Sequence, residues 1–251
     1  MILAAGRGER MRPLTDHTPK PLLSVGGKPL IMWHIEHLRE AGFSEIVINH
    51  AHLGHRLVEA LGDGHALGVR IGWSAEPLAL ETAGGIRHAL PLLGDAPFIV
   101  VNGDVFCDAD LGQLRRAAET LGKDTYCELA PGDLAHLLMV DNPEHHPAGD
   151  FHLAPDARLR AEGSPRLTFT GLGAYHPALF AELADGHPAK LAPLLRTAMD
   201  AGRIGGSYHG GRWVDVGTPA RLAALNAVLL AERDPAEKAD LHAHQGERCS
   251  T

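Results

Sequence analysis

The sequence is poor in aromatic residues and cysteines, and it contains no long apolar run. Aromatic residues make up 5% of the 251 positions, so the hydrophobic residues, 45% of the chain, must build a core mainly from aliphatic side chains. No apolar stretch is long enough to span a bilayer. The leading residues, MILAAG, have neither the charged segment nor the sustained apolar stretch of a signal peptide. We therefore expect a cytoplasmic protein with no membrane partner.

Cysteine and basic charge are scarce as well, and each shortage argues against a class of protein. Cys107, Cys127 and Cys249 are odd in number and lack metal-site spacing, which favours reduced thiols. The formal net charge of −8 argues against general nucleic-acid binding. Residues 1–28 nevertheless contain five basic residues against two acidic ones. This local excess suits either a site for a small polyanion or an ordinary solvated surface.

Strand-like and helix-like segments alternate through the first half of the chain. Short apolar runs predict strands at 45–50, 69–74 and 97–102. Amphipathic stretches predict helices at 29–41, 54–61 and 85–93. Asp110 is expected to cap another helix, which begins near Leu111. This alternation predicts a three-layer α/β fold with a mixed, mostly parallel sheet.

The second half has a different pattern. From 125 to about 175, shorter strands broken by Pro, Gly and His predict a small antiparallel lid. Further segments are expected as helices at 177–183 and 191–201, a strand pair at 205–209 and 212–216, and a last helix at 219–232. We predict a single domain at 1–234, divided into halves at 1–124 and 125–234, and a flexible tail at 235–251.

A short glycine loop follows the first three residues. Gly6 and Gly8 allow a close approach of backbone to a ligand, and the loop N–H groups can cradle a phosphate. A Rossmann fingerprint would need glycine at Met11, and a Walker A motif would need Ser or Thr at Pro29. Three residues are few for a central strand, so we expect that some upstream residues are absent from this sequence.

The string L-A-A-G-R-G-E-R-M-R-P-L-T at Leu3–Thr15, with T-P-K-P-L at 18–22, closely resembles the signature of the sugar-1-phosphate nucleotidylyltransferases. The resemblance implies that Arg10 and Lys20 are catalytic, holding the triphosphate and stabilising charge in the transition state. It also implies a nucleotide site formed by Leu3, Ala5, Gly6, Gly8, Glu81, Gly84 and Asn102.

Two aspartates match the metal-binding segments of this family. Asp104 follows an apolar run in N-G-D, and Asp215 lies in W-V-D-V-G-T. The resemblance implies that they hold Mg²⁺ between the two substrates, an arrangement that suits a hard cation. Either aspartate alone is equally typical of a turn. Seventeen histidines, His145 and His146 among them, form no closed metal spacing, and we expect them at the surface.

The segments that resemble the sugar and base sites depart from the usual family pattern. Thr170 and Gly171 lie in the stretch that matches the family's sugar segment. Glu81 occupies a place where relatives usually carry glycine, and Lys190 stands where others carry an acidic sugar-binding residue. Lys190 is expected to pair with a substrate carboxylate, or else to be an ordinary solvated lysine at a helix start.

These departures, with E-I-V-I-N-H, E-T-A-G-G-I and K-L-A-P-L-L, resemble the N-acetylmuramate-1-phosphate uridylyltransferases of bacterial cell-wall recycling. The resemblance implies uridylyl transfer from UTP to N-acetyl-α-muramate 1-phosphate by a monomer or homodimer. A mannose-1-phosphate guanylyltransferase or another hexose-1-phosphate enzyme is the alternative in the same class. A non-catalytic regulator that binds nucleotide sugars is the alternative in another class.

Overall fold

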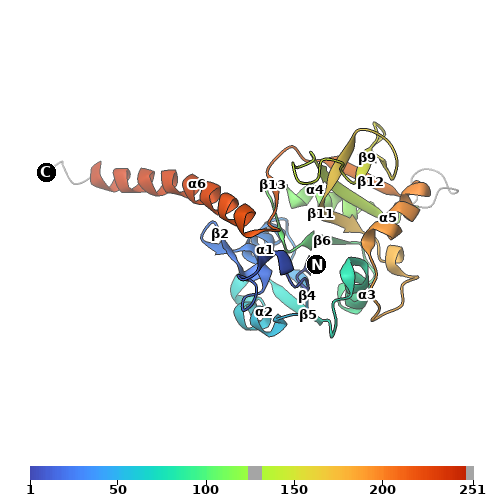
Figure 1. Ribbon diagram of the computed structural model, residues 1–251, viewed down its shortest axis with the longest axis horizontal. Coiled ribbons are helices and arrows are strands. Elements are labelled where there is room, and N and C mark those ends of the chain that lie inside the picture. The colour runs from blue at the N-terminus through green and yellow to red at the C-terminus, as the bar shows by residue number, and fades with distance from the viewer. Residues whose placement is uncertain (124–131, 247–251) are drawn as a thin grey trace.

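A single twisted sheet forms the centre of the molecule (Figure 1). The computed structural model describes residues 1–123 and 132–246, with side chains as far as Glu232. Four parallel strands form one side of the sheet in the order β6-β1-β4-β5, with β5 at its edge. They are β1 (Ile2–Leu3), β4 (Glu45–His50), β5 (Arg70–Ala75) and β6 (Phe98–Asn102). The three strands expected in the first half are thus confirmed, and the two-residue β1 lies between β4 and β6.

Helices cover both faces of this sheet because its strands are apolar on both sides. In β6, Val100 packs with helices α3 and α5, whereas Ile99 and Val101 pack with α1, α2 and α4. Successive side chains of a strand point to opposite faces, so the two clusters form two separate core layers. The five helices are α1 (Leu30–Glu40), α2 (Gly54–Leu61), α3 (Glu81–Leu93), α4 (Leu111–Ala118) and α5 (Leu191–Asp200). The predicted three-layer α/β fold is confirmed.

The second half extends the same sheet with antiparallel pairing. Strand β11 (Arg166–Tyr175) runs antiparallel to both β6 and β8 (Ala135–Val140), and β9 (Phe151–Leu153) with β10 (Leu159–Arg160) continues it outward. The small antiparallel region is therefore present, but it is continuous with the central sheet. The first residues of the expected lid, 125–131, lie outside the described residues.

The two strands expected to pair at 205–209 and 212–216 do not pair with each other. Strand β12 (Ile204–Tyr208) lies parallel to β8, whereas β13 (Trp213–Asp215) pairs antiparallel with β7 (Val105–Cys107). Each strand gains a partner from far away in the chain, which no local turn signal could reveal. The β7–β13 ladder sets Asp215 opposite Val105, next to Asp104.

Several helical boundaries also differ from expectation. Helix α3 begins at Glu81, four residues early, and 177–183 contains only a 3-10 turn, η4 (Pro177–Phe180). Helix α6 (Pro219–Gly246) continues past the expected end at Glu232 and projects from the body (Figure 1). Its last residues fall within the expected tail, of which 247–251 lie outside the described residues. The remaining elements are η1 (Glu9–Met11), η2 (Lys20–Leu22), β2 (Ser24–Val25), β3 (Lys28–Pro29) and η3 (His65–Leu67).

Among the described residues, no helix has the length and apolar character needed to cross a membrane.

Candidate active site

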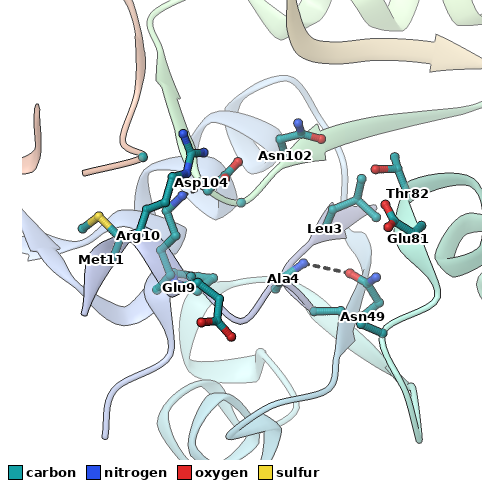
Figure 2. Close-up of a pocket in the computed structure, with 18 of the residues that line it drawn as sticks. Leu3, Ala4, Glu9, Arg10, Met11, Asn49, Glu81, Thr82, Asn102 and Asp104 are labelled. Carbon is teal, nitrogen blue, oxygen red and sulfur yellow. Dashed lines mark hydrogen bonds and ion pairs between the residues drawn. The ribbon is translucent and has the colours of Figure 1, made fainter. Parts of the chain in front are cut away.

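A cavity of about 440 Å³ opens at the carboxyl ends of β1 and β6, beside the start of α3 (Figure 2). Ligands of open α/β sheets commonly bind at this edge. Most of the predicted nucleotide, catalytic and metal-binding residues line it, although they come from four separate segments. These are Leu3, Ala5, Gly6, Gly8, Arg10, Lys20, Glu81, Asn102 and Asp104.

The glycine loop folds into a tight turn over this cavity. Gly8 has φ +67°, a left-handed conformation that costs other residues free energy, and it begins the short helix η1. The Thr15 hydroxyl donates to the Gly8 carbonyl at 2.9 Å. Buried Met11 anchors the far end of η1. The loop therefore presents backbone to the cavity from a fixed position.

Two cations in the cavity differ in their freedom. Lys20 Nζ pairs with Asp104 Oδ2 at 2.7 Å, and the lysine side chain is only 8% exposed against 42% for the aspartate. Arg10 is exposed and makes no ion pair with any other residue that the structure describes. Figure 2 shows its guanidinium on the same side of the cavity as Asp104. Lys20 is thus a charge held by an ion pair and Arg10 an exposed charge without one among the described residues, both at the glycine-loop end of the cavity.

A buried polar network forms the opposite end of the cavity, and sequence reasoning missed it. Asn49 Oδ1 accepts from the Ala4 N–H at 2.8 Å, and Asn49 Nδ2 donates to Glu76 Oε1 at 2.6 Å. Glu76 Oε2 accepts from the Leu80 N–H at 2.9 Å. The network ties β1, β4 and the segment before α3 together. The only sequence signal was the position of Asn49 near the end of a predicted strand.

Gly84, predicted to contact nucleotide, packs beneath the cavity and does not line it. Its N–H and that of Ala83 donate to the Ala189 carbonyl at 3.1 and 2.9 Å. A Cβ at Gly84 would lie 2.5 Å from the His187 carbonyl oxygen, and one at Gly85 would lie 2.6 Å from Glu76 Oε1. These glycines let α3 approach its neighbours closely, so they help to position the residues that do line the cavity.

A second cavity of about 320 Å³ adjoins the first and shares Asn102 and Asp104 with it. Strand β11 contributes one wall, the loop before β9 another, and β13 a third. It is lined by Asn102, Asp104, Val105, His145, His146, Thr168, Phe169, Thr170, Gly171, Trp213 and Asp215. Thr170, Gly171, Asp104 and Asp215 are therefore brought together, although 111 positions separate the two aspartates in the chain.

Asp215 has two neighbours that the sequence did not predict. Arg221 Nη1 lies 3.1 Å from Asp215 Oδ2 and donates to His145 Nε2 at 2.6 Å. His145 Nε2 itself lies 3.6 Å from the same carboxylate oxygen. Arg221 stands two residues after Pro219 in the first turn of α6. His145 is exposed, as expected, and its side chain also lines this cavity.

Gly171 and Thr170 shape the wall of the second cavity through the backbone. Gly171 has φ +82°, and a Cβ there would lie 2.5 Å from Asn102 Nδ2. The Thr170 hydroxyl is buried, donating to the Leu138 carbonyl at 2.8 Å and accepting from the Leu172 N–H at 3.0 Å. The Trp213 indole donates to the Thr170 carbonyl at 2.9 Å. These contacts hold the register shift of β11 in place beside Asn102.

Lys190, like Gly84, is a predicted site residue that lines neither cavity. It is exposed and precedes the first turn of α5. The carbonyl of the neighbouring Ala189 accepts from the Ala83 and Gly84 N–H groups at the start of α3.

His34 lies buried in α1 beneath this region. Burial, with a smaller contribution from His37, lowers its pKa to about 4, and the field of Asp104 only partly opposes the shift. Its Nε2 has no hydrogen-bond partner among the described residues. The imidazole is therefore neutral near pH 7 and belongs to the support of the site.

Cations and carboxylates where two cavities meet are what an enzyme needs to transfer a charged group between two substrates. The comparisons specify the class. Residues 1–133 match the family model described as nucleotidyl transferase. The chain is 54% identical over 234 residues to the N-acetylmuramate alpha-1-phosphate uridylyltransferase of Neisseria meningitidis, covering 92% of this chain and 98% of that protein. The chain therefore belongs to the nucleotidyl transferase family.

Two further comparisons agree with this assignment. A second N-acetylmuramate alpha-1-phosphate uridylyltransferase, from Caulobacter vibrioides, is 35% identical, with 89% of this chain and 94% of that protein covered. A crystal structure from Bacillus anthracis, assigned as a glucose-1-phosphate thymidylyltransferase, has a TM-score of 0.78 at 22% identity. It covers 91% of this chain and 94% of its own, and it supports the fold.

Proposed function

We propose that this protein transfers a uridylyl group from UTP to N-acetyl-α-muramate 1-phosphate, giving UDP-N-acetylmuramate and pyrophosphate. The observation that carries the proposal is the 54% identity to the Neisseria uridylyltransferase over almost the whole of both chains. The two cavities that meet at Asp104 supply space for two substrates in contact. Such an enzyme would serve cell-wall recycling in the cytoplasm, as a monomer or homodimer.

The first cavity is proposed to hold UTP. Gly6 and Gly8 would place backbone N–H groups against the phosphates, with Leu3, Ala5, Asn102 and Glu81 completing the site and Gly84 packing beneath it. Arg10 would follow the charge that develops on the α-phosphoryl oxygens and the departing pyrophosphate, since it is exposed and unpaired within the described chain. Lys20, held by Asp104, would act from a fixed position.

The second cavity is proposed to hold the sugar phosphate against Thr170 and Gly171. The sugar phosphate can attack the α-phosphorus in line, so no covalent enzyme intermediate is needed. Lys190 lies outside the lining of this cavity, and it remains our candidate for pairing with a lactyl carboxylate that extends beyond the lining, a group that glucose lacks. His145, which accepts a hydrogen bond from Arg221, adds a polar group at the other side of the same cavity.

The residues present fit a Mg²⁺ ion. Asp104 and Asp215 both line the second cavity, and each uses Oδ2 for its cationic partners. In the described part of the chain, Oδ1 of neither aspartate accepts a hydrogen bond from the protein. Mg²⁺ favours a site with one or two carboxylates completed by substrate oxygens and water. When bound, the ion would neutralise phosphate charge between the substrates.

The test is pyrophosphate release from UTP with Mg²⁺ and one of four acceptors: the 1-phosphates of N-acetylmuramate, N-acetylglucosamine, glucose and mannose. We expect a strong preference for the muramate substrate. Activity with another sugar, or with GTP or dTTP alone, would keep the family and discard this substrate. Nucleotide binding without any pyrophosphate release would instead indicate the non-catalytic regulator.

A further inference from the structure

Glu81 combines features that no structural role explains. It has φ +59°, in the left-handed region, where a side chain strains the backbone. Its carboxylate is exposed to the first cavity and makes no hydrogen bond or ion pair with the residues that the structure describes. An acidic residue in the first turn of a helix interacts favourably with the helix dipole, but this does not require a strained backbone. Strain kept at a cavity wall points to a ligand.

The position of Glu81 identifies which part of a nucleotide it meets. Figure 2 shows Glu81 and Thr82 beside Leu3, on the side of the cavity away from Arg10 and Asp104. A triphosphate held by the glycine loop and these cations leaves the base to occupy the Glu81 end. A carboxylate beside phosphates would repel them, whereas at the base it meets neutral N–H edges. At this end of the cavity, Glu81 lies away from the phosphate positions that its charge would repel.

The buried Asn49 and Glu76 side chains at this end are already occupied. Both Glu76 carboxylate oxygens accept from protein donors, and both ends of the Asn49 amide are bonded. Among the described carboxylates at this end, Glu81 is therefore the one that can still accept a hydrogen bond from a ligand. A carboxylate can only accept hydrogen bonds when ionised. It can therefore accept a hydrogen bond from the imino N–H of uracil. In cytosine, the corresponding ring nitrogen carries a lone pair and offers no donor.

We propose that Glu81 determines base specificity by accepting a hydrogen bond from the imino N–H of the base. It thereby selects uracil, and equally any base with such a donor, over cytosine and adenine, which carry a lone pair at the corresponding ring nitrogen. The inference rests on the proposed nucleotide site but not on the identity of the sugar.

The experiment compares UTP and CTP binding to the wild type and to Glu81→Gln by calorimetry, with Mg²⁺ and without sugar phosphate. We expect the wild type to prefer UTP, and Glu81→Gln to lower the UTP-to-CTP affinity ratio by about tenfold or more, the usual worth of a charged hydrogen bond. The amide can turn its NH₂ toward the cytosine ring nitrogen, so CTP affinity should rise as well. Glu81→Gly removes the acceptor and should lower the ratio without raising CTP affinity.

Glu9→Gln is the matched control, because Glu9 is also an exposed carboxylate lining this cavity but lies in the phosphate loop. It should leave the UTP-to-CTP ratio unchanged. Thermal unfolding of Glu81→Gly separates recognition from support: relief of the left-handed backbone should keep or raise the midpoint, whereas a structural role would lower it.

An unchanged ratio in Glu81→Gln, or an equal change in Glu9→Gln, would overturn the inference. A wild type that binds CTP or ATP better than UTP would overturn it together with the proposed nucleotide. UTP selection that depends on Glu81 in a protein that uses a different sugar would refute only the substrate proposed above.

Discussion

The two halves of the molecule build their parts of the site in different ways. In residues 1–123, Gly8, Arg10 and Lys20 lie within one short stretch of chain, and a tight loop delivers them to the first cavity. In the second half, the cavity wall is assembled from β11, the loop before β9, and β13. Strand β13 reaches the site only because it pairs with β7, a strand of the first half. The glycine-loop part of the first cavity is thus a local structure, whereas the wall of the second cavity is a tertiary one.

This contrast indicates which substitutions should affect mainly the chemistry and which should also affect stability. A residue of the local loop faces the ligand with few protein contacts, so its loss should affect chemistry more than folding. A residue of the assembled wall also holds neighbouring strands together, as Thr170 does for Leu138, Leu172 and Trp213. Its loss should affect stability as well. Asp104 lies where the halves join and should show the largest catalytic effect.

Asp104→Asn removes the carboxylate that both cavities share. It leaves Lys20 buried without its charged partner and removes one of two proposed metal ligands. We expect pyrophosphate release to fall about a thousandfold, the order found when one preorganised charge contact is lost from an active site. Asp110→Asn is the matched control: Asp110 caps α4 through the Gly112 N–H at 2.8 Å, and Asn caps equally well. A loss of less than tenfold in Asp104→Asn would remove Asp104 from the centre of the site.

Features made by one short stretch of chain could be predicted from the sequence, whereas features made by distant segments could not. That Gly8, Arg10 and Lys20 lie around one cavity could be predicted, because they belong to one short motif whose residues stay close in the fold. The Asp110 cap is confirmed for the same reason, since its acceptor and donor are two residues apart. The pairing of β12 with β8 was missed because parallel strands need a long crossover and leave no turn signal.

Buried polar groups were the other omission. In the sequence, Asn49 and Glu76 look like ordinary polar residues at strand ends. In the structure both are buried, and Gly85 of α3 packs directly against them. Arg221 was likewise hidden in a helix that the sequence predicted for its apolar residues. The left-handed backbone of Glu81 could not be predicted, because α3 was expected to begin four residues later, at Gly85. A helix that starts at glycine would have needed no strained residue.

The pH dependence of stability tests the support of the first half. The pKa of His34 is about 4 in the folded protein, well below its ordinary 6.5, so the unfolded chain takes up a proton first as the pH falls. Stability is complete above pH 6.5 and is lost between pH 6.5 and 4, by about 3 kcal/mol at most. Urea unfolding at pH 7.5 and 4.5 measures the loss, which His34→Gln should reduce.

The second half offers a comparison for this effect. Burial also lowers the pKa of His136 in β8, although Asp133 opposes the shift. His136→Gln should therefore reduce the acid sensitivity less than His34→Gln does. If the two variants lost acid sensitivity equally, full burial of His34 would not be the main cause.

A pair of glycines separates folding from ligand approach. Gly171→Ala meets a left-handed φ of +82° and places Cβ 2.5 Å from Asn102 Nδ2, so we expect a loss of about 2 kcal/mol in the free energy of unfolding. Gly6→Ala meets no atom of the described chain within 4 Å and should change that free energy by less than about 0.5 kcal/mol. It should nevertheless weaken UTP binding, because the added methyl group faces the cavity.

Urea titrations of both variants, with UTP binding measured alongside, provide the test. Equal destabilisation by the two alanines would mean that the glycine loop is as tightly packed as the β11 wall. Unchanged UTP binding in Gly6→Ala would mean that the ligand does not approach the loop backbone.

The smallest expected effect concerns His145. Its imidazole accepts from Arg221 Nη1 at 2.6 Å, so it shares the arginine that pairs with Asp215. In His145→Ala, that arginine would pair with Asp215 alone, and the second cavity would lose a polar contact on the proposed sugar side. Contacts of this partly exposed kind contribute about 1 kcal/mol at most, so the KM for the sugar phosphate should rise up to about fivefold. Steady-state kinetics that vary each substrate in turn measure the effect. The KM for UTP should stay the same, because His145 lines only the second cavity. An equal rise in both KM values would show that the two cavities act as one site, and the division between the halves would then hold for folding but not for binding.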